Sequence, residues 1–279
     1  MRLILMLLAL AFAAAPAAAE PRVIREGLAN MTGTYEYILR SEITGQDYLV
    51  QVAEPVRPVG RGQKAPVVFV LDGNYFFGMA TDVARNLQIV REIGPAWIVA
   101  VGFPGEGLGP WIDGRNRDYV HVVQEDGGRR TGGGGEGFQR FLTEELRPFL
   151  ASNPYMDLDH TVLYGHSASG LFTARVLSTH PEAFDGYLIG SPAVFVEPAI
   201  MDRIAAWPGG AQRPRVFLGY AGGDMEARIL ADMPRLTQAL EAGDRYDLQV
   251  RAFPDQTHVS VEGVLFANGL KFLLPPPAP

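Results

Sequence analysis

The sequence predicts an α/β fold with a mostly parallel central sheet that is covered by helices on both faces. Short apolar runs alternate with amphipathic runs along nearly all of the 279 residues, and this alternation is typical of parallel sheets. Several runs are apolar at every position, as strands buried on both faces are. Hydrophobic residues make up 47% of the chain, which is sufficient for one large core.

The expected elements follow the chain in order. Thr32–Arg40 and Asp47–Glu54 form a predicted antiparallel hairpin with its turn at Gly45. Further strands are expected at Pro66–Leu71, Ala96–Phe103, Gly186–Gly190, Val216–Tyr220 and Leu248–Phe253. Helices are expected at Phe76–Ile93, at Gly137–Ser152 and from the N-cap residue Ser260 to Leu273. The glycine-rich residues 104–135 are expected to be irregular.

The first residues predict a secretory signal peptide. Arg2 supplies a positive charge, residues 3–14 are an unbroken apolar run, and alanines at 17–19 offer a cleavage site. The apolar run is too short for a permanent membrane anchor. We therefore expect a signal peptide at 1–19, a single domain at 20–274 and a proline-rich tail at 275–279. The mature protein is expected in the periplasm, with full secretion as the alternative.

Charge and composition exclude several kinds of partner. The formal net charge is −7 at pH 7, so neither nucleic acid nor an anionic membrane surface is an expected partner. The chain contains no cysteine, which excludes a disulfide framework. No group of residues has metal-ligand spacing. A glycine-rich nucleotide-binding loop would follow a buried strand, and the glycine-rich residues 131–137 do not. Neither a metal nor a cofactor is expected.

Residues 162–170, Val-Leu-Tyr-Gly-His-Ser-Ala-Ser-Gly, predict a strand that turns sharply into a helix. Small residues around Ser167 tolerate the strained backbone of such a turn, which lifts the serine hydroxyl clear of the sheet. The positive end of the following helix, expected from about Ala168 to His180, points to the same place. Ser167 is therefore the predicted nucleophile of a hydrolase.

A serine hydroxyl needs an adjacent base before it can attack a carbonyl. His258 lies in the loop after the strand Leu248–Phe253, and parallel sheets build their sites from the loops at the carboxyl ends of their strands. We therefore expect His258 to act first as general base and then as general acid. The side chain of His166, next to Ser167 in sequence, is expected to point away from the working face of the nucleophile.

The base in turn needs a carboxylate that fixes its tautomer. In the expected chain order this acid lies between the serine and the histidine. Asp224 and Glu226 follow the buried strand Val216–Tyr220, so Asp224 is the first candidate and Glu226 the second. Asp255 is a weaker third candidate because it is close to His258 in sequence. A helix cap at Asp224 is the structural alternative.

The negatively charged tetrahedral intermediate needs hydrogen-bond donors for its oxygen. One expected donor is the backbone N–H of Ala168, directly after the nucleophile. The second is expected in the loop after the first central strand, at Gly73 or Asn74, because Gly73 permits close approach of the backbone.

Four segments together resemble the α/β-hydrolase group that includes esterase D, the periplasmic siderophore esterases, bacterial feruloyl esterases and the mycolyltransferases. The segments are Val70–Phe76, Arg115–Tyr119, Gly165–Gly170, and Ser191-Pro192 followed by His258. The second segment resembles an Arg-x-Arg-Asp-Tyr signature of the siderophore-esterase branch. The resemblance implies an α/β-hydrolase fold and a serine esterase that works through an acyl-enzyme, with siderophore-like or aromatic-acyl esters as small-molecule substrates.

Two features depart from the pattern of that group. Ser169 stands where the group usually has glycine, and the acid of the siderophore branch is poorly defined, which bears on Asp224. Two alternative functions stay open at this point. One is an acyltransferase, which passes the same acyl group to an alcohol. The other is a binding protein with a disabled site, which Ser169 alone suggests.

Four residues are candidates for substrate binding. One of Arg115 and Arg117 is expected to face the cleft and attract an anionic or catecholate substrate. The alternatives are a solvated pair, or a brace of the loop through Asp118. Tyr75 and Trp111 are candidate wall residues of an aromatic pocket, although aromatic side chains more often belong to the core.

Overall fold

The computed structural model describes residues 31–57, 59–60, 62–126, 129–223, 227–274 and 276. From Gly33 onward the chain is one compact unit, and the description below concerns this part. The predicted signal peptide, the candidate acids Asp224 and Glu226, and all of the proline-rich tail except Pro276 lie outside the described residues. None of the helices in the described ranges has the length and hydrophobicity that a membrane crossing requires.

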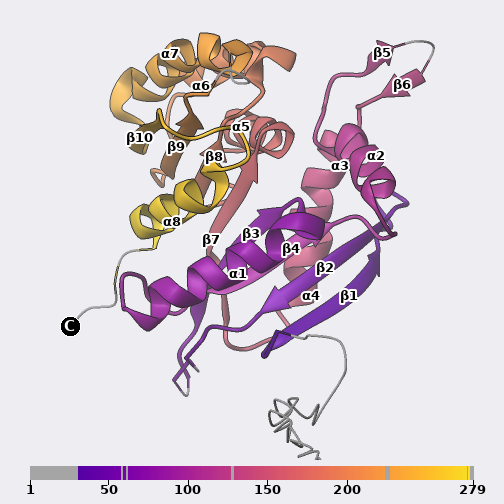
Figure 1. The fold of residues 1–279 in the computed structure, drawn as a ribbon, viewed down its shortest axis with the longest axis vertical. Coiled ribbons are helices and arrows are strands. Elements are labelled where there is room, and N and C mark those ends of the chain that lie inside the picture. The colour runs from indigo at the N-terminus through magenta and orange to yellow at the C-terminus, as the bar shows by residue number, and fades with distance from the viewer. Residues whose placement is uncertain are drawn as a thin grey trace, which may run out of the picture. The chain divides into compact units, whose positions relative to one another are not determined.

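An eight-stranded sheet with the order β1-β2-β4-β3-β7-β8-β9-β10 organises the fold (Figure 1). Its strands are β1 (Thr34–Arg40), β2 (Asp47–Ala53), β3 (Ala65–Leu71), β4 (Trp97–Gly102), β7 (Met156–His166), β8 (Gly186–Gly190), β9 (Arg215–Ala221) and β10 (Asp247–Phe253). β2 pairs antiparallel with β1 and with β4, and all other neighbours are parallel. The mostly parallel sheet and its first hairpin are thus confirmed.

Helices cover both faces of this sheet. They are α1 (Gly73–Ile89), α2 (Leu108–Asp118), α3 (Gly135–Arg140), the π-helix η1 (Phe141–Leu146), α4 (Arg147–Leu150), α5 (Ala168–Thr179), α6 (Ala199–Ala206), α7 (Ala227–Glu241) and α8 (Val261–Leu273), with short 3₁₀ turns at Val194–Val196 and Ala242–Asp244. Because side chains alternate along a strand, Phe69 belongs to the core cluster that includes residues of α5 and α7, whereas Val68 and Val70 belong to the cluster that includes residues of α1 and α8.

The region 104–135 differs from the sequence expectation, since it is not irregular throughout. It contains α2 and a short antiparallel ribbon of β5 (Gln124–Asp126) and β6 (Arg129–Thr131), which Figure 1 places beyond the sheet near α2 and α3. Glycines lower the helix propensity of α2, but Gly114 is required there. A Cβ at Gly114 would lie 2.2 Å from the ring of Phe103. Tertiary packing therefore overrides local propensity.

The loops that follow the parallel strands meet at one edge of the sheet. Asp72 follows β3, Ser167 follows β7, Gly222 follows β9, and the loop that contains His258 follows β10. The fold thus brings residues from four distant parts of the sequence to the same edge.

Candidate active site

Ser167 lies in a sharp turn between β7 and α5, as the sequence predicts. Its backbone has φ 61 and ψ −116, a conformation that a side chain rarely adopts and that marks strained functional turns. The N–H of Ser167 donates to the carbonyl of Gly190 at 2.9 Å, which anchors the turn to β8. A Cβ at Gly165 would lie 2.2 Å from the carbonyl oxygen of Ser169. Only glycine at 165 therefore permits this turn.

Ser167 and His258 line the same cavity, whose volume is about 380 Å³. The cavity is lined by residues from α1, α2 and α8, from the end of β7 with the turn that follows it, and from the loop after β10: Tyr75, Phe76, Leu108, Trp111, Arg115, His166, Ser167, His258, Val259 and Glu262. It contains a hydroxyl, two imidazoles and a carboxyl within mostly apolar and aromatic walls. Such a concave apolar site with a few convergent polar groups is typical of a small-molecule binding site.

Arg117 does not line this cavity, in contrast to Arg115, Tyr75 and Trp111. Its guanidinium makes two hydrogen bonds to Asp118, of 2.8 and 2.6 Å. Burial raises the pKa of the Asp118 carboxyl, and Arg117 opposes that shift. Arg117 therefore pairs with Asp118, which is the alternative that the sequence analysis gives to substrate binding.

The side chain of Asp72 makes several of the contacts that hold the site together, and no pattern in the sequence predicts this role. It is fully buried and has a left-handed φ of 58. Oδ1 accepts from Trp111 Nε1 at 2.8 Å and lies 2.7 Å from Nε of Arg115, while Oδ2 accepts from Ser169 Oγ at 2.8 Å. Its own N–H donates to Tyr119 at 2.9 Å. Burial raises the pKa of Asp72, and Arg115 opposes the shift.

Arg115, Trp111 and Tyr75 form one wall of the cavity. The guanidinium of Arg115 lies 4.4 Å from the centroid of the Trp111 ring, and Tyr75 packs edge-on against Trp111 at 4.7 Å. The charge of Arg115 is compensated by Asp72. This wall is consequently an aromatic surface with a neutralised cation.

The backbone N–H groups that could bind an oxyanion belong to the first residues of α1 and α5. Gly73, the first residue of α1, lies close to β4: a Cβ at this position would be 3.0 Å from the backbone of Val101. The side chain of Asn74 bonds to the N–H and carbonyl of Phe103 at 2.8 and 2.7 Å. Among the described residues, none accepts a hydrogen bond from the backbone N–H of Gly73, Asn74 or Ala168. Such first-turn groups are available to an anion.

His166 lines the cavity, so the expectation that it points away from the site is wrong. It is two residues after Tyr164 in β7 and shares its α1–α8 face, from which the loop of His258 approaches. The ring centroids of His166 and His258 are 4.6 Å apart, and Nδ1 of His166 is 3.5 Å from Oε1 of Glu262. Burial, and then the neighbouring His258, lower the pKa of His166 to about 3.

The loop after β9 lies against the loop that carries His258. A Cβ at Gly222 would be 2.8 Å from Cα of Pro254, and one at Gly223 would be 3.4 Å from Cα of Thr257. Gly223 is the last described residue before position 224. The chain thus arrives next to His258 immediately before the candidate acids.

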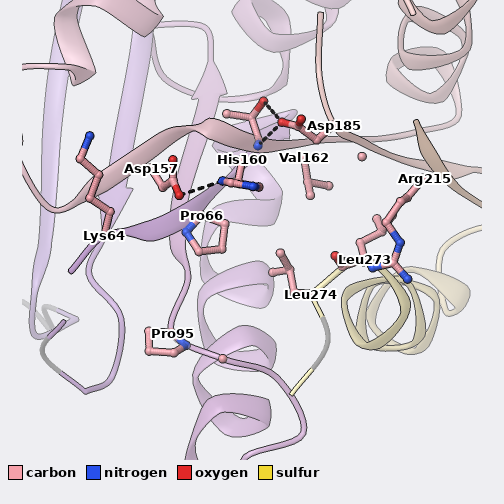
Figure 2. A pocket seen from close by; sticks show the side chains of 13 residues that line it. Lys64, Pro66, Pro95, Asp157, His160, Val162, Asp185, Arg215, Leu273 and Leu274 are labelled. Carbon is pink, nitrogen blue, oxygen red and sulfur yellow. Dashed lines mark hydrogen bonds and ion pairs between the residues drawn. The ribbon is translucent and has the colours of Figure 1, made fainter. Parts of the chain in front are cut away.

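A second cavity, of about 490 Å³, lies at the opposite edge of the sheet (Figure 2). It is lined by the first residues of several strands, including Pro66 of β3, together with Leu273 and Leu274 after α8. His160 there pairs with Asp157 at 2.8 Å, and the lining contains no serine. The cavity at Ser167 is therefore the candidate active site. Among the described residues, no cluster of His, Asp or Glu could hold a metal ion.

Comparison with known proteins identifies the family. A model of the family described as "Putative esterase" matches residues 41–262. The ferri-bacillibactin esterase BesA of Bacillus subtilis is 30% identical over 270 residues, which cover 88% of this chain and 91% of that protein. The siderophore enterobactin esterase of Emericella nidulans is 27% identical over 256 residues, which cover 76% and 83%.

A solved structure shows the same fold. The BES protein of Bacillus cereus has a TM-score of 0.76 at 24% identity and covers 91% of this chain and 99% of its own. The predicted α/β-hydrolase architecture is confirmed by this likeness and by the strand order. The chain belongs to this esterase family and is an ester hydrolase.

Proposed function

We propose that Ser167 is the nucleophile and His258 the general base of this esterase. The observation that carries the proposal is that both side chains line one cavity, with Ser167 held in the strained turn after β7. His258 takes the proton of the Ser167 hydroxyl while the oxygen attacks the ester carbonyl. It then gives this proton to the leaving alcohol, and an acyl-enzyme remains. Water, activated by the same histidine, releases the acid.

Asp224 or Glu226 is proposed as the acid that orients His258. The contacts of Gly222 and Gly223 with Pro254 and Thr257 support this, since they bring the chain next to His258 just before these carboxyls. An acid at this place stabilises the imidazolium that forms during attack. Asp224 stays the first candidate.

The oxyanion is proposed to accept hydrogen bonds from the N–H of Ala168 and from that of Gly73 or Asn74. The hydrogen bond from Ser169 Oγ to Asp72 Oδ2 supports this pairing, because it ties together the residues next to Ala168 and Gly73. Each donor of this kind contributes a factor on the order of 10²–10³ in rate.

Siderophore-like or aromatic-acyl esters are the proposed substrates. The curated relatives carry names of siderophore esterases, and the wall of Tyr75, Trp111 and Arg115 offers aromatic stacking. Arg115 is proposed to contact the substrate through the face of its guanidinium that is not stacked on Trp111, since Asp72 compensates its charge. The residues 1–19 resemble a secretory signal peptide, and the proposed compartment is the periplasm.

The test is a panel of esters with purified protein lacking residues 1–19. The wild type is expected to hydrolyse a cyclic catecholate triester or a feruloyl ester faster than short aliphatic esters. Ser167→Ala should lose turnover by up to about 10⁶-fold, while Ser152→Ala, at an exposed serine, should retain it. Retained turnover in Ser167→Ala contradicts the mechanism. Preference for the aliphatic ester contradicts the substrate class only.

A further inference from the structure

Glu262 is a buried carboxyl that the proposed mechanism does not use. It lies in the first turn of α8, is 8% exposed and lines the cavity of Ser167 and His258. Its Oε1 is 3.5 Å from Nδ1 of His166, and within the described residues its buried Oε2 has no hydrogen-bond partner. Burial of a carboxyl with so little compensation costs free energy. Packing alone gives no reason for glutamate at this position.

The imidazole of His166 is packed against three neighbouring groups. On one side, a Cβ at Gly190 would be 2.8 Å from Cδ2 of His166, so only glycine fits in β8. On the others are the carboxyl of Glu262 and the ring of His258, at 4.6 Å between centroids and 49° between planes. The ring of His166 is thus a direct neighbour of both Glu262 and His258.

The pair carries little charge at neutral pH. Burial, reinforced by the negative charge of Asp72 and opposed by Arg115, raises the pKa of Glu262 to about 8. The pKa of His166, at about 3, keeps its imidazole neutral. The titratable groups around Glu262 are His166 and Tyr164 of β7, His258 of the loop between β10 and α8, and Asp72 with Arg115. Neither member of the pair is therefore a cation at neutral pH, so neither repels the imidazolium formed during attack.

We propose that Glu262 is a positioning residue of the esterase reaction, which holds the ring of His166 against His258 so that His258 faces Ser167. The inference rests on the proposed roles of Ser167 and His258. Glu262 touches neither the nucleophile nor the reacting carbonyl in this role. When Glu262 ionises in alkaline solution, its negative charge stabilises the imidazolium on His258 and raises the rate.

The experiment compares Glu262→Gln and Glu262→Leu with the wild type and with Glu241→Gln as matched control. Glu241 is exposed at the end of α7 and does not line the cavity. For each protein, kcat and KM for a p-nitrophenyl ester are measured from pH 5.5 to 9.5, next to a thermal melting curve. The rate of Ser167 labelling by a fluorophosphonate is recorded in parallel.

The expected results separate a positioning role from a merely structural one. In the wild type, kcat/KM is expected to show an additional, second rise near pH 8, where Glu262 loses its proton. Glu262→Gln keeps the shape of the side chain but cannot ionise, so it loses this second rise. Glu262→Leu lowers kcat by on the order of 10-fold with KM unchanged. Glu241→Gln behaves as the wild type. Because Glu262→Gln is nearly isosteric, the pH profile decides even if Glu262→Leu does not fold.

A second rise that persists in Glu262→Gln, or a wild-type kcat in folded Glu262→Leu, overturns the inference. If the fluorophosphonate labels Ser167 in all variants while these results occur, only the role of Glu262 is wrong. If Ser167 is not labelled in the wild type, the proposed nucleophile itself is wrong, so the two failures are distinguishable.

Discussion

The hydroxyl of Ser169 donates a hydrogen bond of 2.8 Å to Oδ2 of the buried Asp72. This bond joins the turn after β7 to the loop after β3 across 97 positions of sequence. It also links the two segments that contain Ala168 and Gly73, the proposed oxyanion donors. Ser169 stands at the position where the resembled group usually has glycine, and in the structure its hydroxyl has Asp72 as a partner.

Ser169→Ala is expected to loosen this link without adding bulk. The loss leaves Oδ2 of Asp72 with one donor fewer, so the free energy of unfolding should fall by about 1–3 kcal/mol, and kcat by roughly 10-fold or more. Urea unfolding and steady-state kinetics measure the two effects. Ser152→Ala, at an exposed hydroxyl that donates to the carbonyl of Phe149, serves as control. Unchanged kcat in Ser169→Ala would show that the link does not position the oxyanion donors.

Arg115→Met is expected to be strongly destabilising. The change leaves Asp72, whose side chain is 0% exposed, without its counter-ion, and breaking a buried pair costs about 3–5 kcal/mol. Arg235→Met is the matched control, because Arg235 and Asp202 are 52% and 72% exposed and such pairs contribute less than about 1 kcal/mol. Urea unfolding at pH 7 measures both. Equal losses in the two variants would contradict the role assigned to the buried pair.

Glu262→Gln is expected to gain stability over the wild type as pH rises. The pKa of Glu262 is about 8 in the folded protein, against an ordinary value of 4.5. Between these values the folded protein holds a proton that the unfolded chain releases, so wild-type stability falls with rising pH, by at most about 1.4 kcal/mol per pH unit. Melting temperatures at pH 5 and pH 8 test this. A difference between variant and wild type that is the same at both pH values rules out the buried neutral carboxyl.

Gly165→Ala is expected to abolish activity, and Gly263→Ala to be harmless. A Cβ at Gly165 would meet the backbone oxygen of Ser169 at 2.2 Å, whereas one at Gly263 in α8 would meet nothing within 4 Å. Alanine in an open helical position adds roughly 0.5–1 kcal/mol of stability. Soluble yield, melting temperature and ester turnover are compared. Normal turnover in Gly165→Ala would mean that the turn does not have the described geometry.

Much of the fold was predictable because its signals are local. The apolar run of β3 and the alternation in β2 report burial directly, and the turn at Ser167 needs small residues in a fixed order. α2 was not predictable in this way, because Gly114 lowers its helix propensity and only the contact with Phe103 explains the residue. Elements that depend on distant packing leave no pattern in their own segment.

The candidate site divides along the same line. Ser167 and His258 follow from strand ends and chain order, and the structure places both at one cavity. Asp72, Glu262 and the orientation of His166 depend on which side chains meet across the sheet edge, and no spacing in the sequence encodes that meeting. Asp224 and Glu226 remain predictions, supported by the course of the chain at Gly223.

Covalent labelling of Ser167 by a fluorophosphonate, located by peptide mass spectrometry, tests the central claim that this hydroxyl and His258 act together. The wild type is expected to carry a single adduct on Ser167. His258→Gln should slow the labelling by about 10³-fold or more, while His180→Gln, at an exposed histidine after α5, should label like the wild type. An adduct on another residue, or wild-type labelling of His258→Gln, would contradict the account.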